Sequence, residues 1–472
     1  MLCRAGVRYG SRDCSGGIPV PQLEKMGTAL TGLKRAVLSK SGVAATIQTS
    51  MVQAVILFIN FGTGVITART LGPGGRGEQA VLQMWPQIFA LAFTLGLPLS
   101  MIYNLKRYPE RDSQFFSTAL LVGTVMGFLA TLTGVLFLPY WLTQYSPEVV
   151  RSAQWIMLLA PLALLFTILN DVARAREEFT VYNMGQFLRP ALTLLALIAL
   201  VLTHYLTPLS AALSYVLTFM PLTLWMLIRY CRVYHLTLRG FGAAFRTLIS
   251  YGVRSYGVYL FGYLVAGQLD RVLVVGLLDS VEMGLYVAAI ALARTLLIFP
   301  NAVSRVVLPK AASRPLEETV ALIGRGTRVS TSLALLVASI LAILGPLMLT
   351  LVYGQGFQGA VPVFRLLLAD TVLYGATLIL SQAFMAHNKP GVVSLMQGLS
   401  VGLVIPLLLI LVPRYGLVGA GLAVLISTTV RFIFAIVTFP IIFRVRPPRL
   451  RPTWNDFTTI FHERKGGRGA GN

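Results

Sequence analysis

The chain has 472 residues, of which 56% are hydrophobic and only 12% are charged, and its mean hydropathy is +0.75. Soluble domains carry about 25% charged residues, so this composition excludes a soluble multidomain protein. The net charge of +22 would suit a nucleic-acid-binding protein, but the basic residues lie between apolar runs and form no single basic face. The composition therefore predicts a polytopic membrane protein.

The N-terminal residues 1–42 are polar, glycine-rich and basic, without the apolar core of a signal peptide. Met26 begins an amphipathic stretch, and one hypothesis is that translation starts there. The three cysteines, Cys3, Cys14 and Cys231, lie far apart without metal-ligand spacing, which predicts no disulfide and no metal site. We expect the basic segment to contact anionic lipid headgroups on the cytoplasmic side.

Apolar runs long enough to cross a bilayer follow this segment. A spanning helix needs about 20 mostly apolar residues. Twelve such runs lie at about 43–68, 79–104, 116–138, 148–170, 186–204, 208–230, 253–278, 281–303, 329–352, 362–388, 392–412 and 418–443. Their length and the lack of period-two alternation favour helices over a β-barrel. The sequence thus predicts an all-α protein with twelve transmembrane helices.

The distribution of Lys and Arg between these runs predicts their orientation. Both terminal segments and every second connection are basic, whereas the remaining connections contain only Arg69, Arg76, Arg151 and Arg414. Cytoplasmic connections are the ones that collect Lys and Arg. Both termini are therefore predicted to be cytoplasmic, which agrees with an even number of spans.

An internal repeat divides the predicted helices into two sets of six. Residues 65–80 overlay residues 272–287 at an offset of 207, which aligns Gly77 with Gly284. Residues 175–188 overlay residues 386–399 at an offset of 211. Repeats with an even number of helices share their orientation and are related by an axis along the membrane normal. The predicted parts are a basic N-terminal segment (1–42), a six-helix bundle (43–230), a basic cytoplasmic linker (231–252), a second bundle (253–443) and a basic tail (444–472).

Five segments in order resemble the polysaccharide flippase family, which includes the O-antigen repeat-unit flippases. They are ARTLGPGGRGEQA after the first run, LDRVLVVGLLDSVEMGLYVAA in the seventh, LVYGQGFQGAVPVFRLLL at 351–368, AHNKPG at 386–391 and YGLVGAGLAVLIS at 415–427. The resemblance covers about 43–443. It implies two six-helix bundles around a central cavity that opens alternately to each side, as in multidrug transporters of the same superfamily.

Glycines in the predicted helices and turns are interpreted as structural. The turn LGPGGRGE lacks the Lys and Ser/Thr of a phosphate-binding loop, so it predicts a tight reversal, with Gly77 and Gly284 at the start of the helices that follow. Two pairs have small-xxx-small spacing and predict close helix packing: Gly123 with Gly127, and Gly398 with Gly402.

Ionisable residues within the apolar runs are the candidate site, because a charge at bilayer depth costs at least about 2.5 kcal/mol and usually faces a cavity. Four arginines are predicted to bind a diphosphate, since guanidinium groups bind phosphate oxygens in pairs: Arg294, Arg271, Arg69 and Arg76. Three acids are predicted to line the cavity or couple transport to an ion: Asp270, Asp370 and Glu78.

Structural interpretations of the same charges stay open. Arg294 could form an ion pair with Asp270, and Asp370 could pair with an arginine instead of binding a proton or Na⁺. For Arg365 and Arg431, a side chain that extends to the membrane interface is the preferred interpretation.

These observations predict an inner-membrane flippase for a polyprenyl-diphosphate-linked oligosaccharide. The alternative is a cation-coupled drug or metabolite exporter of the same fold. A membrane-embedded glycosyltransferase would need a catalytic carboxylate and a large outer loop, so an enzyme is disfavoured. We expect no cofactor and no nucleic-acid partner. The expected partners are the lipid-linked saccharide and membrane lipids, and glycosyltransferases or a polymerase of the same pathway are further candidates.

Overall fold

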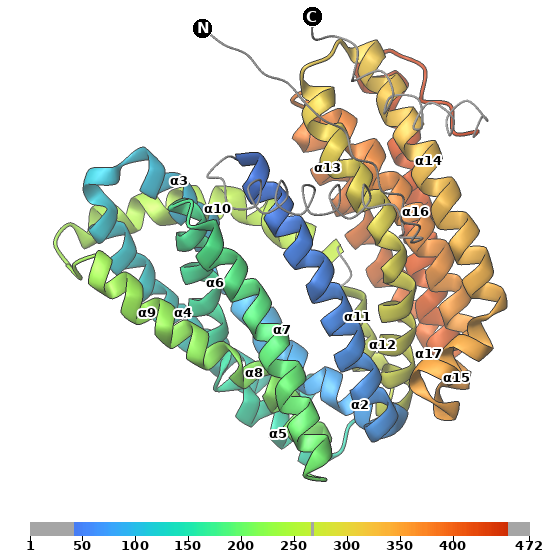
Figure 1. Cartoon of the computed structure of the whole chain (residues 1–472), viewed down its shortest axis with the longest axis horizontal. Coiled ribbons are helices and arrows are strands. Elements are labelled where there is room, and N and C mark those ends of the chain that lie inside the picture. Colours follow the sequence, from blue (N-terminus) through green and yellow to red (C-terminus); the bar gives the residue numbers. More distant parts are fainter. Residues whose placement is uncertain (1–41, 266–268, 452–472) are drawn as a thin grey trace, which may run out of the picture. The chain divides into compact units, whose positions relative to one another are not determined.

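The computed structural model describes residues 42–265 and 269–451, and the regular structure in these ranges is helical, without a strand (Figure 1). The described residues 42–55, which begin helix α2, belong to a separate compact unit from residues 56–451. In chain order the elements before residue 266 are α2 (Gly42–Ala92), α3 (Leu97–Arg107), η1 (Pro109–Arg111), α4 (Asp112–Trp141), α5 (Pro147–Met157), α6 (Ala160–Ala175), α7 (Phe179–Leu202), α8 (Pro208–Leu217), α9 (Phe219–Val233) and α10 (Phe241–Val265). The elements after residue 268 are α11 (Leu269–Leu277), α12 (Ser280–Ala293), η2 (Arg294–Leu297), α13 (Ile298–Ala312), α14 (Leu316–Ile343), α15 (Gly345–Tyr353), η3 (Gln355–Ala360), α16 (Val361–Ala386), α17 (Pro390–Thr438) and the π-helix η4 (Phe439–Phe443). We call the described residues 56–265 the N-terminal half and 269–451 the C-terminal half. Residues 1–41 of the predicted N-terminal segment (1–42) and residues 452–472 of the predicted tail (444–472) lie outside the described residues.

Eight helices in the described ranges are long and apolar enough to cross a membrane, or nine if the bent pair α5–α6 is one span. The two longest are each interrupted by a glycine with positive φ, Gly72 (68°) in α2 and Gly416 (55°) in α17. Glycine adopts this conformation without the strain that a Cβ would cause. The predicted run 79–104 is also interrupted, because the left-handed residues Leu95 and Gly96 separate α2 from α3. The exact count of twelve spans stays a prediction.

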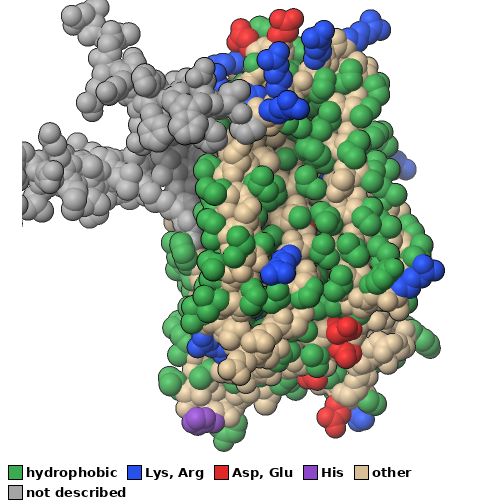
Figure 2. Space-filling view, turned by 90° about the vertical axis from the view of Figure 1, so that its right-hand side faces the viewer, with side chains coloured by type: hydrophobic (Ala, Val, Ile, Leu, Met, Phe, Trp, Pro, Cys, Tyr) green, Lys and Arg blue, Asp and Glu red, His purple; other side chains and the backbone are tan. Residues whose placement is uncertain are grey.

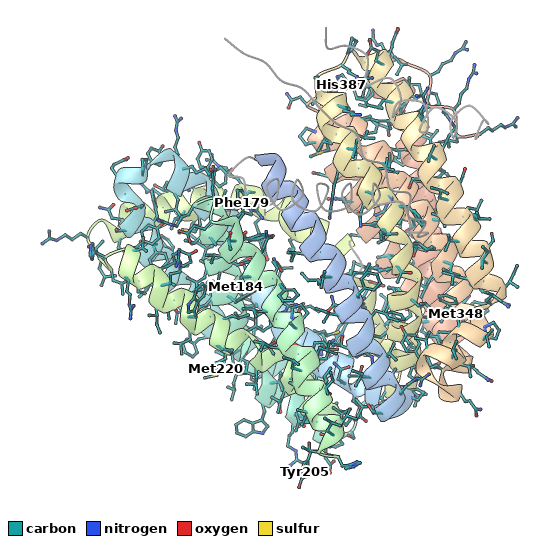
Figure 3. The ribbon with its side chains drawn as sticks, viewed as in Figure 1. Phe179, Met184, Tyr205, Met220, Met348 and His387 are labelled. Carbon is teal, nitrogen blue, oxygen red and sulfur yellow. The ribbon has the colours of Figure 1, made fainter. Side chains whose placement is uncertain are left out.

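The surface has the distribution of side chains that a bilayer requires. Figure 2 shows one face, on which hydrophobic side chains cover the middle and most Lys and Arg side chains gather at one end. Large apolar side chains are highly exposed, for example Phe58 (74%), Phe128 (64%) and Leu195 (62%). Figure 3 places Tyr205 and His387 at opposite ends of the molecule, as expected for connections predicted on opposite sides of the membrane.

Close packing in the N-terminal half centres on α6, which contacts α3, α4, α7 and α9. Gly123 and Gly127 let α4 approach α6, since a Cβ at Gly123 would lie 2.6 Å from Ile168 Cδ1 and one at Gly127 2.6 Å from Pro161 Cα. The predicted close packing at this pair is confirmed.

Helix α16 occupies the corresponding position in the C-terminal half, in contact with α12, α13, α14 and α17. The prediction for Gly398 and Gly402 is wrong, because no atom lies within 4 Å of a Cβ built on either residue. Small-xxx-small spacing places two glycines on one helix face but does not determine whether another helix packs there.

The two halves meet where α2 crosses α12. A Cβ on Gly77 would overlap the carbonyl oxygen of Ser280, and a Cβ on Gly284 would overlap that of Pro73. Pro73 and Ser280 are also 207 residues apart, so this contact is symmetric under the predicted repeat. Each glycine lies five residues after a helix break, Gly72 in α2 and Asp279 before α12, and not at the first residue of the helix as predicted. Its packing role is a close backbone approach. We call these four residues the glycine crossing.

Two further contacts join the halves near the same connections. The indole Nε1 of Trp141 donates to the carbonyl oxygen of Val272 at 2.9 Å. The guanidinium of Arg69 donates to the carbonyl oxygens of Leu351 and of Val352, the latter at 3.0 Å. The halves are therefore joined on the side predicted to face outward.

Candidate functional site

A charged cluster is buried in the C-terminal half. It contains Asp270 on α11 (4% exposed), Asp370 on α16 (6%) and Arg431 on α17 (5%). Tyr286 donates its hydroxyl to Asp270 Oδ2 at 2.6 Å, and Thr428 hydrogen-bonds to Asp370. The structure thus positions each carboxylate with a hydroxyl from a neighbouring helix.

The charges of this cluster balance. Arg294, at the junction of α12 and η2, and Arg431 both interact electrostatically with Asp370. These four side chains, two carboxylates and two guanidinium groups, surround a cavity of about 40 Å³, which is close to the ~30 Å³ that one water occupies in the liquid. The structure therefore brings together Asp270, Arg294 and Asp370, which were predicted from separate segments of the sequence.

Arg431 corrects one interpretation of the sequence. Its guanidinium does not extend to the interface but lies 4.8 Å from the centre of the Tyr374 ring. An aromatic face and a nearby carboxylate stabilise a buried cation, and neither partner is adjacent in sequence. Arg365, by contrast, is exposed and donates to the Ala342 carbonyl oxygen at 3.1 Å, in agreement with a surface role.

The other predicted residues lie elsewhere. Arg69 is exposed and engaged with backbone carbonyls of α15, as described above. Arg76 is buried next to the glycine crossing and donates to the side chain of Gln79. Glu78 and Arg271 are partly buried, on α2 and α11 respectively. The predicted residues therefore form no single cluster.

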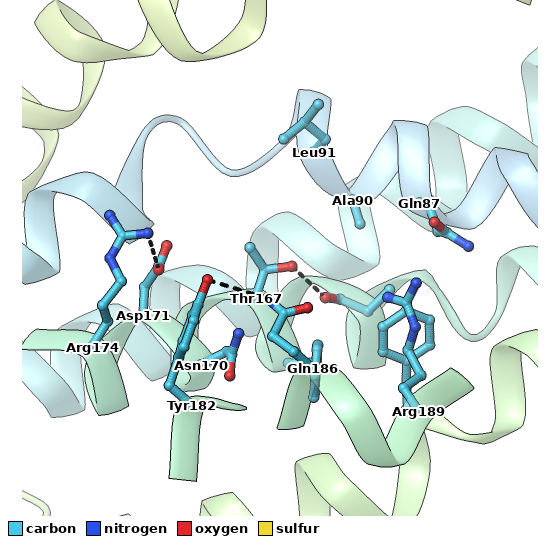
Figure 4. A pocket seen from close by; sticks show the side chains of 13 residues that line it. Gln87, Ala90, Leu91, Thr167, Asn170, Asp171, Arg174, Tyr182, Gln186 and Arg189 are labelled. Carbon is cyan, nitrogen blue, oxygen red and sulfur yellow. Dashed lines mark hydrogen bonds and ion pairs between the residues drawn. The ribbon is translucent and has the colours of Figure 1, made fainter. Parts of the chain in front are cut away.

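A second cavity, of about 290 Å³, lies in the N-terminal half (Figure 4). Helices α2, α6, α7 and α9 supply its lining: Gln87, Ala90, Leu91, Ala163, Phe166, Thr167, Asn170, Asp171, Arg174, Tyr182, Gln186, Arg189 and Phe219. We call it the N-terminal cavity. Sequence reasoning missed it, although the polar pair Asn170–Asp171 at the end of an apolar run was a signal.

Polar groups of the N-terminal cavity are only partly satisfied by the protein. Asp171 is 8% exposed and forms an ion pair with Arg174 at 3.3 Å. Asn170 is 5% exposed, and its Oδ1 has no hydrogen-bond partner. Gly185 makes room for this amide, since a Cβ there would lie 2.9 Å from Asn170 Oδ1. An unsatisfied buried amide oxygen costs about 1–3 kcal/mol.

A hydrogen-bond network holds the connection between α6 and α7. Glu178 accepts from Arg176 Nε at 2.8 Å, and from Arg229 and Tyr230 at 3.1 Å each. Partial burial raises the pKa of Glu178, but these hydrogen bonds outweigh that effect, so the pKa lies below its usual range. The network fixes α9 to the end of α6, next to Arg174 of the cavity.

Solved structures with this arrangement of helices are membrane transporters. The lipid II flippase MurJ in an inward closed conformation aligns with a TM-score of 0.71 and 12% identity, covering 90% of this chain and 94% of that one. An inward-facing multidrug resistance MATE transporter of the MOP superfamily aligns with a TM-score of 0.63 and 13% identity, covering 83% and 96%. A MOP superfamily transporter from Pyrococcus furiosus aligns at 0.53 and 14%, covering 87% and 95%. The chain thus has the all-helical fold of these multi-pass membrane proteins.

The sequence model of one family matches the chain itself. It describes polysaccharide biosynthesis proteins and covers residues 43–314, more than half of the chain. The chain belongs to this family, and the predicted resemblance to polysaccharide flippases is confirmed. No curated protein sequence matches significantly.

Proposed function

We propose that the protein moves a polyprenyl-diphosphate-linked oligosaccharide from the cytoplasmic to the outer leaflet of the inner membrane. The family and the flippase fold support a lipid-linked substrate. The observation that carries the proposal is the polar N-terminal cavity inside helices whose outer faces are apolar. Polar side chains at bilayer depth usually mark a substrate path.

In this mechanism the two predicted six-helix bundles, 43–230 and 253–443, alternate between inward and outward opening. The contacts at the glycine crossing close the outer side, while the prenyl tail remains in lipid. Arg294 and Arg271 bind the diphosphate in the inward state. Arg69 and Arg76 act on the outer side, where phosphate oxygens would replace the carbonyl and amide oxygens that they now contact.

The buried acids Asp270 and Asp370 couple this movement to an ion, and Glu78 lines the outer part of the path. The charges of Asp270, Asp370, Arg294 and Arg431 cancel, so an added proton or Na⁺ alone would leave an unbalanced charge in a dry environment. An arginine that moves to phosphate as the ion binds avoids that cost. The arrangement therefore supports coupling of ion binding to diphosphate binding.

The proposal is tested first in cells that lack the gene. Lipid-linked saccharides should accumulate on the cytoplasmic leaflet, and the intact gene should reverse this. Arg294→Ala and Arg271→Ala should abolish the rescue while inserting normally. Arg365→Ala is the matched control, because that exposed side chain contacts only a backbone carbonyl among the described bonds.

One outcome would contradict the flippase function, and another would contradict only the diphosphate site. Normal saccharide distribution combined with raised sensitivity to cationic compounds would favour an exporter. Full activity of both arginine variants would refute the diphosphate site alone.

A further inference from the structure

The two halves carry a cavity at equivalent positions of the repeat. Six residues that line the N-terminal cavity are Ala163, Phe166, Thr167, Asn170, Tyr182 and Gln186. The residues 211 positions later are Tyr374, Thr377, Leu378, Ser381, Val393 and Gln397, and all six line one small cavity in the C-terminal half. This offset is the one found in the sequence for residues 175–188. The two cavities are therefore the same place in two copies of one fold.

The two equivalent cavities differ greatly in volume. The N-terminal cavity measures about 290 Å³ and its counterpart about 50 Å³. The exchange of Ala163 for Tyr374 adds a phenol ring in the C-terminal half. Thr167 and Tyr182 correspond to the apolar Leu378 and Val393, whereas the apolar Ala163 and Phe166 correspond to Tyr374 and Thr377. Because the C-terminal copy folds with a nearly closed cavity, the fold itself does not require the open one.

The polar atoms show the same difference. The Ser381 hydroxyl donates to the Leu378 carbonyl oxygen of its own helix at 2.7 Å. The equivalent Asn170 has an amide oxygen without a partner, and the residue is 5% exposed. Figure 4 shows Asn170, Thr167 and Gln186 together around the cavity. One copy satisfies its polar group internally, whereas the amide oxygen of Asn170 is buried beside Gly185 without a partner among the described residues.

The lining chemistry selects among ligand groups. Asp171 repels an anion, and its ion pair with Arg174 already neutralises that guanidinium. Arg189 lies 4.6 Å from the centre of the Phe219 ring. Amides, hydroxyls and a carboxylate–guanidinium pair beside aromatic rings suit a ligand that has many hydroxyl groups and apolar C–H faces.

We propose that the N-terminal cavity binds the saccharide of the lipid-linked substrate, and that its C-terminal counterpart binds none. The proposal rests on the flippase function proposed above. It separates the recognition of the sugar, by the N-terminal half, from that of the diphosphate, by arginines elsewhere. The saccharide specificity of the transporter then depends on Ala163, Asn170 and their neighbours on α6 and α7.

Exchange of residues between the copies tests this. Ala163→Tyr fills the cavity as Tyr374 fills its counterpart, and Asn170→Ser introduces the residue that the other half already accommodates. Proteoliposomes would receive either the saccharide-bearing lipid extracted from gene-deficient cells or saccharide-free polyprenyl diphosphate. Ala163→Tyr should slow transport of the first lipid at least tenfold. Asn170→Ser should weaken its apparent affinity about fivefold, the loss expected for one hydrogen bond. Apparent affinity for the saccharide-free lipid should stay unchanged in both.

Ser381→Ala, which changes the equivalent residue of the C-terminal half, is the control and should transport the saccharide-bearing lipid like wild type. Equal transport of that lipid by wild type and both N-terminal variants would overturn the saccharide site but leave the flippase function intact. Equal losses for both lipids would also overturn it, since the cavity would then act on something other than the sugar. A wild-type protein that moves neither lipid would refute the proposed function itself.

Discussion

Gly284→Ala should shift the protein toward the state that is open on the predicted outer side. The added Cβ would overlap the Pro73 carbonyl oxygen across the glycine crossing. The carbonyl oxygen of Pro73 is a backbone atom, and the position of the added Cβ is fixed by the backbone of α12. Rotation of a side chain therefore cannot relieve the contact. The halves must separate there by enough to restore a carbon–oxygen distance of about 3.3 Å.

The size of the shift follows from the cost of overpacking. Inserting a methyl group into a tightly packed contact costs about 1–3 kcal/mol. If that cost exists only while the crossing is closed, the ratio of open to closed molecules rises about 5- to 150-fold. The better helix propensity of alanine, worth up to about 1 kcal/mol, acts in both states and cancels.

Disulfide formation across the crossing measures this ratio. A Cβ at Gly74 would lie 3.9 Å from Ser280 Oγ, so Gly74→Cys and Ser280→Cys should cross-link readily after Cys3, Cys14 and Cys231 are replaced by serine. The cross-linking rate follows the fraction of molecules in which the crossing is closed. Adding Gly284→Ala should therefore slow it by at most about 5- to 150-fold, the full factor applying when the open state already predominates, whereas Gly398→Ala should not change it. An unchanged rate in the Gly284 variant would refute the idea that this contact separates during transport.

Three other predictions concern different parts of the molecule. Asp370→Asn should remove the dependence of transport on a proton or Na⁺ gradient, and an unchanged pH and Na⁺ profile in proteoliposomes would refute the coupling role. Glu178→Gln should lower stability by about 1 kcal/mol at neutral pH. Because the folded-state pKa of Glu178 lies below the unfolded value, this difference in Tm should vanish as the pH falls below about 4; a constant difference would contradict the assignment. Gly127→Ala should lower Tm through overlap with Pro161 at a cost of about 1–3 kcal/mol, while Gly402→Ala, in open space, should not.

The helical membrane fold follows from the sequence because the length of apolar runs and the positions of Lys and Arg depend only on local composition. The family follows from five short segments that occur in order along the chain. The repeat was also detectable, since Gly77 and Gly284 align at one offset. Local patterns do not say which helix faces meet. Arg431 was therefore expected at an interface, although α16 and α17 enclose it.

The N-terminal cavity was missed for a similar reason. Asn170 and Asp171 end an apolar run, and from sequence alone they look like the start of a cytoplasmic connection. Only the packing of α6 against α7, permitted by Gly185, places Asn170 inside the protein. Single polar residues at span ends carry little information until the helices around them are known.

The repeat explains why the two copies match at the glycine crossing but differ in their cavities. At the glycine crossing the equivalent residues of the two copies face each other, so a change in one copy affects the same contact as a change in the other. Inside each half the equivalent cavities do not touch, so they are free to differ. Tyr374 narrows the cavity of the C-terminal copy, which also contains the balanced charges of Asp270, Asp370 and two arginines, while the cavity of the N-terminal copy is open. A transporter that must bind a sugar and respond to an ion can divide the two tasks between its copies, and the same opening of the crossing would couple them.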